Sequence, residues 1–441
     1  MAPNPLFKAP ARPTPANAKP TRELLRYFPQ FSLAERDRRW DRVRKRMLMA
    51  GIDCLLLLGN DIYWGMGMAN MRYLLHVDSH LGGVGIFPIE GEPVFWNGVP
   101  HSNRPTSMYH STQEWIFDIR VRGPLTLVAE ELKARGLDES RIGMVGFTSA
   151  IQTSATLLHE EVVTLEKILP RADLTDASFL LQQLRMTKSE EEIGMLREAG
   201  KIARRVLDTM RETARPGVTE AEVYAEMIRT QIALGGEPNV FNLLSSGPVE
   251  HPEEELWHLL HGCEQPLSPS MRPLEKGDIV ISEWHTKYCG YRCHTEYSVY
   301  LGKTPPRELA NIWAVSVDCL EASKEALTAG RTIREAAAMI RKPADDAGLD
   351  WVELGFHAMG TASPEFPTVI YPEGYGSNLM NGSRIGDLVL EEGMTFGNNI
   401  DLHDSRWKPD VGFMLADFMV VRPNQAECLI GTPTEFPSIA C

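Results

Sequence analysis

The chain has 441 residues, of which 43% are hydrophobic and 24% charged, and its formal net charge is −14 at pH 7. This length and composition are typical of two or three packed globular domains and exclude a disordered chain. Lysine and arginine are scattered along the chain, so the negative charge favours neither nucleic acid nor an anionic membrane as a partner.

The cysteines and the N-terminal segment indicate the cellular compartment. Seven cysteines without regular spacing argue against a disulfide framework and favour a reducing environment. The N-terminal residues lack the apolar region of a signal peptide, and no run of about 18 apolar residues occurs. We therefore expect a cytoplasmic protein that does not cross a membrane.

The N-terminal part of the chain predicts an arm followed by an α/β domain. Residues 1–21 are rich in proline and predict an extended arm. A charged amphipathic helix is expected after Ser32 and ends at Gly51, and the apolar run that follows predicts a buried strand. Further strand-like runs alternate with helical ones, so residues 22–178 are expected to form one α/β domain.

The remaining residues, 179–441, predict an α+β domain. A long amphipathic helical stretch begins near Asp176 and ends at the Pro216-Gly217 turn. Two strand-like runs then flank Cys289-Gly290 and predict a β-hairpin. Helix pairs alternate with antiparallel hairpins along this half.

Several segments of this half resemble, in order, the creatinase and aminopeptidase P family, M24. GDIVISEWHTKYCGYRCHTEYSVYLG is similar to its metal-binding hairpin, HAMG to its HGIG motif, and LEEGMTFGNNI and GFMLAD to its last two ligand strands. The resemblance covers residues of about 180 to 425. It implies a pita-bread fold for the C-terminal domain, beside the α/β N-terminal domain, and a homodimer.

The resemblance also bears on metals. Metal-dependent members bind two divalent ions through two Asp, one His and two Glu, and the matching places here hold Glu283, His294, His357, Asn399 and Ala416. Ala416 has no donor atom, and the neutral amide of Asn399 poorly replaces a bridging carboxylate. We therefore expect no cofactor, with one divalent metal as the alternative.

Metal-free creatinase offers a closer pattern, because it carries a substrate-binding glutamate at the place of Glu296. Strand alternation around a Cys289-Gly290 turn lets Glu283, His294 and Glu296 converge. Such a mechanism needs a proton-shuttling histidine, for which His251, His258 and His261 are candidates and His261 has the nearest spacing. The predicted catalytic residues are His261, Glu296, His357, Glu283 and His294, and the predicted substrate-binding residues are His285, Asn399 and Glu365. Asp401 and His403 are interpreted as polar loop residues that border the site.

The function hypothesis is a metal-independent hydrolase that cleaves a C–N bond of a small polar substrate by His and Glu acid-base chemistry, as creatinase and ectoine hydrolase do. One alternative is a lyase or hydrolase with a single metal at Glu283, His294 and His357, similar to dimethylsulfoniopropionate lyase. A metal-dependent Xaa-Pro peptidase and a non-catalytic binding module are further alternatives. The substrate itself is left open.

Overall fold

The computed structural model describes residues 25–60, 67–79, 82–97, 113–121, 125–146, 157–238, 241–250, 269–368 and 384–441. The chain divides into two compact units, Met1–Arg185 and Met186–Cys441. The boundary expected between residues 178 and 179 lies at the start of α7 (Ser178–Met186), whereas this division falls near its end. The predicted arm, residues 1–21, lies outside the described residues.

The first unit is an α/β unit, as the sequence predicts. Its six-stranded sheet has the order β4-β3-β2-β1-β5-β6, in which β1 pairs antiparallel with β2 and parallel with β5. Its strands are β1 (Cys54–Gly59), β2 (Gly83–Pro88), β3 (Val94–Asn97), β4 (Ile119–Val121), β5 (Arg141–Val145) and β6 (Asp173–Asp176). Its helices besides α7 are α2 (Leu33–Ala50), α3 (Ala69–Leu75), α5 (Leu125–Ala134) and α6 (His159–Ile168).

Helix α2 begins and ends where the sequence places it. The Ser32 side chain accepts a hydrogen bond from the backbone N–H of Glu35, which satisfies a donor that the first turn leaves open. Gly51 ends the helix in the left-handed region, with φ of 65°, a conformation that glycine adopts without steric cost.

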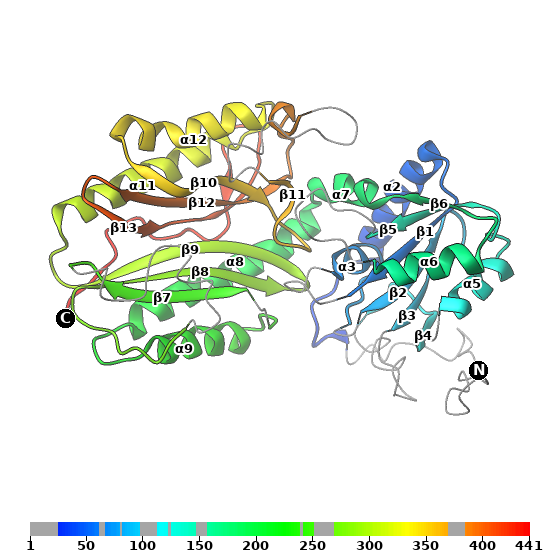
Figure 1. Cartoon of the computed structure of the whole chain (residues 1–441), viewed down its shortest axis with the longest axis horizontal. Helices are drawn as coiled ribbons and strands as arrows, with labels where there is room; N and C mark the ends of the chain where they lie inside the picture. Colours follow the sequence, from blue (N-terminus) through cyan, green and yellow to red (C-terminus); the bar gives the residue numbers. More distant parts are fainter. Residues whose placement is uncertain are drawn as a thin grey trace. The chain divides into compact units, whose positions relative to one another are not determined.

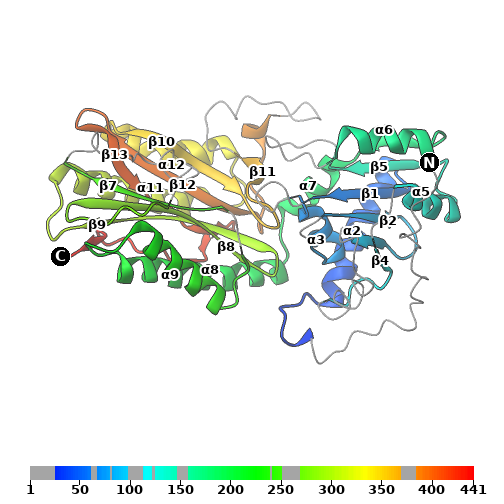
Figure 2. The same cartoon turned by 60° about the horizontal axis from the view of Figure 1, so that its bottom comes forward.

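The second unit places two sheets between two pairs of helices, which is the arrangement visible in Figures 1 and 2. One sheet has the order β16-β9-β8-β7, and the other has the order β11-β10-β12-β14-β15 with β13 paired to β12. The helices are α8 (Glu190–Thr213), α9 (Glu220–Ala233), α11 (Arg307–Ala326) and α12 (Ile333–Ala347), with a short 3-10 turn η4 (Ile385–Asp387). The strands are β7 (Asn242–Pro248), β8 (Asp278–Tyr288), β9 (Tyr291–Leu301), β10 (Asp350–Ala358), β11 (Glu365–Thr368), β12 (Thr395–Asp404), β13 (Lys408–Met414), β14 (Phe418–Val420), β15 (Glu427–Cys428) and β16 (Ser438–Ile439).

Strand β9 shows why the interior between the sheets is secluded. All of its residues are buried, because one face contacts α8 and the other faces β12 and β13. A polar side chain on the inward face of β9 is therefore removed from water and must find partners or a ligand.

The hairpin of β8 and β9 turns at Cys289-Gly290, as predicted. Both residues have positive φ, 49° and 78°, which is the combination of a two-residue turn that matches strand twist. The resulting register sets Glu283 opposite Glu296 and His285 opposite His294.

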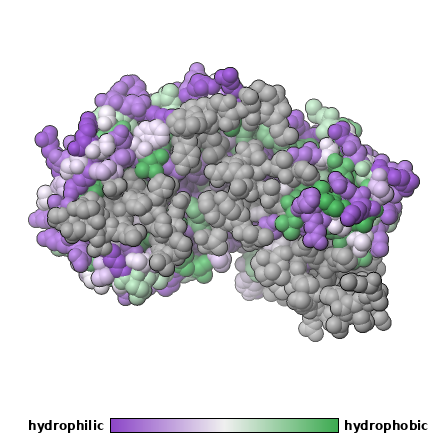
Figure 3. All heavy atoms as spheres, in the orientation of Figure 1, coloured by the Kyte–Doolittle hydropathy of each residue, from purple (hydrophilic) through white to green (hydrophobic). Residues whose placement is uncertain are grey.

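Among the described residues, no helix is both long enough and apolar enough to cross a membrane. On the face drawn in Figure 3, most of the described surface is hydrophilic, and hydrophobic residues occupy smaller patches.

Candidate functional site

Four strands of the second unit bring buried histidines, carboxylates and an amide together. On each strand the polar residues are separated by two or four positions, so strand alternation places them on one face. They are Glu283 and His285 on β8, His294 and Glu296 on β9, Glu353 and His357 on β10, and Asn399 and Asp401 on β12.

The first group consists of Glu283, His285 and His294, whose ligand atoms lie within 4.8 Å of one another. Glu283 Oε1 is 3.1 Å from His285 Nε2 and 3.3 Å from His294 Nε2. Burial raises the pKa of Glu283, but the hydrogen bonds and charges of the two histidines outweigh it and leave that pKa below its usual range. Glu283 is therefore an anion at neutral pH.

His285 is held on both ring nitrogens. Its Nδ1 lies 3.1 Å from Ser363 Oγ, while Nε2 faces Glu283. Burial lowers the pKa of His285 to about 4, against the opposing effect of Glu283. The neutral ring can then donate from Nε2 to Glu283 and accept from Ser363 at Nδ1.

The second group consists of Glu296, Glu353 and Asp401, again with ligand atoms within 4.8 Å of one another. Asn399 Nδ2 donates to Glu296 Oε1 at 2.7 Å and to Glu353 Oε2 at 2.9 Å. Apart from the contact between the two carboxyl groups themselves, the oxygens of Asp401 and Oε2 of Glu296 have no hydrogen-bond partner among the described residues. Burial, reinforced by neighbouring carboxylates, raises the pKa of both Glu296 and Asp401 well above the usual range.

His294 and His357 lie where the two groups meet. His294 Nε2 is 3.4 Å from Glu296 Oε1 as well as close to Glu283, and its ring centroid is 5.1 Å from that of His357. Nδ1 of His294 and Nδ1 of His357 have no hydrogen-bond partner among the described residues, whereas His294 Nε2 faces the carboxylates of Glu283 and Glu296. Burial, with a contribution from the other two histidines, lowers the pKa of His357 well below its ordinary value, so this ring is neutral at pH 7.

The structure brings together most of the residues that the sequence singles out. Six of them lie in this centre: Glu283, His285, His294, Glu296, His357 and Asn399. Glu365 joins neither group, because it is 3.1 Å from Lys188 Nζ and accepts from Thr361 Oγ1 and the Ala362 N–H. His261, like His251 and His258, lies outside the described residues.

Two residues of the centre, Asp401 and Glu353, were not assigned to it from the sequence. Asp401 and His403 were interpreted as loop residues, which is wrong, since both lie within β12 and Asp401 is fully buried. Glu353 was not singled out at all. The signal that points to them is even spacing, because Asp401 follows Asn399 by two positions and Glu353 precedes His357 by four.

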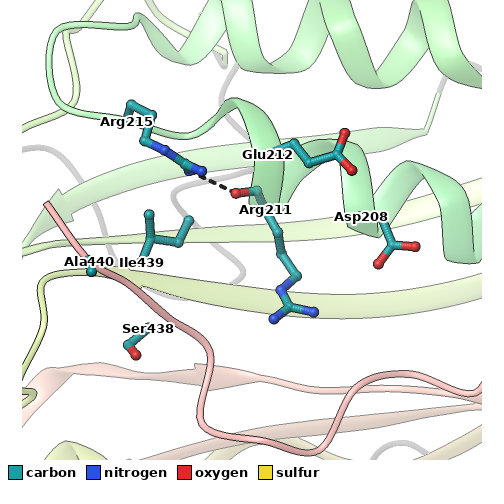
Figure 4. A pocket seen from close by; sticks show the side chains of 7 residues that line it. All are labelled: Asp208, Arg211, Glu212, Arg215, Ser438, Ile439 and Ala440. Carbon is teal, nitrogen blue, oxygen red and sulfur yellow. Dashed lines mark hydrogen bonds between the residues drawn. The ribbon is translucent and has the colours of Figure 1, made fainter.

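The centre is distinct from a surface pocket of about 450 Å³ in the same unit. Figure 4 shows that pocket between α8 and the C-terminal residues 438–440, with Arg211 and Arg215 beside Asp208 and Glu212. The Arg215 guanidinium donates to the carbonyl of Arg211. The described residues that line this pocket include no histidine, and they comprise two acids and two bases.

Comparisons with known proteins agree with this fold. The model of Peptidase_M24, metallopeptidase family M24, matches residues 194–423, just over half of the chain. The chain is therefore a pita-bread hydrolase of the class that cleaves C–N bonds, and it belongs to family M24.

The individual relatives that we compared share 28% sequence identity or less with this chain. The chain is similar to an ectoine hydrolase of Halomonas elongata, at 24% identity over 89% of this chain and 94% of that protein. It is 28% identical to a probable dipeptidase PepE of Mycobacterium tuberculosis over 68% of this chain and 72% of that protein. The solved structure of an Xaa-Pro dipeptidase from Bacillus anthracis superposes with a TM-score of 0.71, 21% identity and coverage of 92% of this chain and all of that one, which shows the shared fold.

The expectation that the protein needs no cofactor is wrong. Its family is one of metallopeptidases, and the described residues include two buried groups that could hold a metal ion. The five inherited ligand places are only part of the site, because other strands bring further carboxyl groups to it. Carboxyl groups at neighbouring places, Glu296, Glu353 and Asp401, add oxygen ligands that Asn399 and Ala416 lack.

The residues present fit a divalent ion. Metal–nitrogen and metal–oxygen bonds of roughly 2.0–2.2 Å place opposite ligands about 4.0–4.4 Å apart, and the ligand atoms of each group lie within 4.8 Å. His294 Nε2, which lies 3.3 Å from Glu283 Oε1 and 3.4 Å from Glu296 Oε1, is a ligand atom that a metal between these groups would take.

Proposed function

We propose that this protein is a metal-dependent hydrolase that cleaves the C–N bond of an amide in a small polar substrate. The observation that carries the proposal is the first group, one ionised carboxylate and two imidazoles buried together at 3.1 and 3.3 Å. Two of its members, Glu283 and His294, occupy hairpin places that hold metal ligands in the family resemblance. One carboxylate with two imidazoles suits zinc, iron, nickel or cobalt.

A divalent cation in such a site supplies Lewis-acid polarisation of the scissile carbonyl. Glu283 provides the negative charge of the group, because its pKa is held below the usual range. His285, the second imidazole of the group, is positioned by Ser363 at Nδ1, so that its Nε2 faces the group beside Glu283.

His357 is suited to moving a proton. It is neutral at pH 7 because burial lowers its pKa, and its Nδ1 has no hydrogen-bond partner among the described residues. A neutral imidazole beside the reacting atoms can take a proton from water and return it to the leaving nitrogen. We assign this acid-base role to His357.

The names of the relatives suggest two substrate classes to test, dipeptides and ectoine. Protein loaded in turn with Zn²⁺, Mn²⁺ or Co²⁺ is incubated with Xaa-Pro dipeptides, other dipeptides and ectoine, and the released amine is measured. We expect turnover in one class with at least one metal. Turnover in neither class with any of these metals would reject the proposal.

A pair of variants controls this assay. Glu283→Gln keeps the shape but removes the charge of the ligand, and we expect turnover to fall at least about a hundredfold. Glu321→Gln, a change on the surface of α11, is expected to leave turnover unchanged. Equal rates in wild type and Glu283→Gln would show that the metal site is misplaced.

The homodimer implied by the family resemblance and the cytoplasmic location stay predictions. Light scattering at micromolar concentration tests the first, because a monomer mass would contradict it.

A further inference from the structure

We propose that the surface pocket beside α8 binds a small zwitterion with an apolar side chain, an aliphatic amino acid, with its carboxylate at Arg211 and its ammonium group at Asp208. The pocket has a volume of about 450 Å³ and shares no residue with the two groups of the buried centre. Small-molecule sites usually measure about 300–1,000 Å³. The pocket is therefore large enough for such a ligand, and this inference does not depend on the proposed function.

Arg211 supplies the end that binds an anion. This residue is half-buried, and its guanidinium forms neither an ion pair nor a hydrogen bond with any described residue. Arg215 lies one helical turn further along, and its Nη1 donates to the carbonyls of Arg211 and Ala214 at 2.8 and 2.6 Å. A planar guanidinium with open donors can hold a carboxylate through two parallel hydrogen bonds.

The two acids of the lining are paired with arginines that lie outside it. The carboxylate oxygens of Glu212 are 3.0 and 3.1 Å from the guanidinium nitrogens of Arg205. Oδ1 of Asp208 is 3.4 Å from Nε of Arg204. Neither Arg204 nor Arg205 lines the pocket. The two arginines of the lining therefore keep their positive charge for a ligand.

The space between Asp208 and Arg211 fits a molecule with two opposite charges. The two residues are three positions apart on α8, a spacing at which opposite charges on a helix commonly pair. Figure 4 shows both side chains leaving the helix on the same side, yet no ion pair joins them. Oδ2 of Asp208 accepts no hydrogen bond from a described residue. An ammonium group can therefore meet Asp208 while the carboxylate beside it meets Arg211.

Tyr297 on β9 gives a second observation at the same place. Its side chain is fully buried, and its hydroxyl has no hydrogen-bond partner among the described residues. Burial raises the pKa of Tyr297 to about 12, and among the charged groups that act on it Arg211 has the largest effect. The hydroxyl therefore lies near this guanidinium, where it can donate to a bound carboxylate directly or through a water.

The wall opposite α8 suits an aliphatic side chain. It consists of Ser438, Ile439 and Ala440, which Figure 4 shows on the C-terminal segment facing the helix. This wall is held in place because β16 pairs with β9, with Ile439 opposite Leu301. An aliphatic group that covers Ile439 would remove apolar surface from water and so stabilise the complex.

The test is isothermal titration calorimetry of the whole chain with L-leucine and two analogues. Isocaproate lacks the ammonium group, and isoamylamine lacks the carboxylate. We expect one L-leucine per chain, bound at least about tenfold more tightly than either analogue, because each analogue leaves one charged partner unused. Arg211→Met should lower the affinity for L-leucine at least about tenfold. Arg229→Met, the same change on the surface of α9, should leave it unchanged.

A second variant separates the two charges of the ligand. Asp208→Asn should lower the affinity for L-leucine at least about fivefold, because the ammonium group loses its partner. The affinity for isocaproate should not fall in this variant. Equal losses for both ligands would show that Asp208 does not contact an ammonium group.

Four other outcomes would overturn the inference. They are wild type that does not bind L-leucine, equal affinity for L-leucine and isocaproate, unchanged affinity in Arg211→Met, and tighter binding of inorganic phosphate than of L-leucine. Binding that is lost in Glu283→Gln but kept in Arg211→Met would place the ligand in the buried centre and would also overturn it. If Arg211→Met fails to fold by circular dichroism, Asp208→Asn and the two analogues decide the question.

The calorimetry also keeps this inference apart from the proposed function. None of its outcomes requires turnover, so failure of the hydrolysis assay leaves the L-leucine result standing. Conversely, a pocket that binds no amino acid leaves metal-dependent hydrolysis untouched.

Discussion

A buried carboxylate of the first unit and one in the centre of the second unit have opposite surroundings. In the first unit, the buried Glu35 accepts from Arg38 Nε and Arg39 Nε, each at 2.7 Å. The Arg39 guanidinium also lies over the rings of Phe31 and Tyr73, at 4.5 and 4.8 Å from the centroids. In the second unit, Asp401 is fully buried, and its neighbours are the carboxyl groups of Glu296 and Glu353 instead of a base.

The pKa values follow this difference. Burial raises the pKa of Glu35, but hydrogen bonds and charges from Arg38 and Arg39 bring it below its ordinary value. Burial and neighbouring carboxylates raise the pKa of Asp401 without such compensation. The second unit can also pair charge internally, as Lys188 and Glu365 show at 3.1 Å. Unpaired carboxylates in the centre are therefore a property of that site, and they indicate a place for a ligand.

The largest expected effect concerns the buried centre of the second unit, where the carboxyl groups have no base as a partner. Prolonged treatment with a chelator should reduce turnover about a thousandfold or more, because metal catalysis contributes several kcal/mol to transition-state stabilisation. Adding back one divalent metal should restore the rate. Chelated protein that contains no metal by elemental analysis and retains full activity would contradict the proposed function.

The buried ion pair of Glu35 and Arg39 in the first unit is tested by Arg39→Met. This change leaves Glu35 buried with only Arg38 and should lower the free energy of unfolding by about 3–5 kcal/mol. Arg38→Met, at a side chain 34% exposed, serves as the control and should cost about 1 kcal/mol or less. Urea denaturation measures both, and similar effects of the two variants would show that the buried pair has no special weight.

A smaller effect of opposite sign is expected from Asp401→Asn in chelated protein. The amide removes a buried carboxyl with raised pKa, so unfolding should become harder by about 1–2 kcal/mol. Because the folded wild type binds more protons than the unfolded chain, this carboxyl lowers stability as pH rises above its unfolded pKa. The advantage of the variant should therefore be larger at pH 8 than at pH 5. A variant less stable than chelated wild type at both pH values would refute this account.

The smallest expected effect concerns the serine N-caps that begin one helix in each unit. Ser32 caps α2, and Ser189 caps α8 in a reciprocal arrangement with Glu192. Replacing either serine by alanine should cost about 1 kcal/mol, the usual value for an N-cap. Denaturation curves of Ser32→Ala and Ser189→Ala measure this, and a difference of several kcal/mol between them would show that capping depends on the unit.

Local patterns in the sequence determine a large part of this protein. The Ser32 and Gly51 ends of α2, the Cys289-Gly290 turn and the alternation along the hairpin all depend on residues close together in the chain. For the same reason, the convergence of Glu283, His294 and Glu296 follows from one turn and a period of two.

Only the tertiary structure decided which other residues join them. Glu353 and Asp401 reach the centre through the pairing of β10 with β12, whose register shifts between Trp351 and Leu354. Such a shift changes which side chains face inward, and it arises from packing between distant segments. The expectation of no cofactor failed for the same reason, because the ligands of a site are all the carboxyl groups and imidazoles that the fold brings within a few ångströms, wherever they stand in the chain.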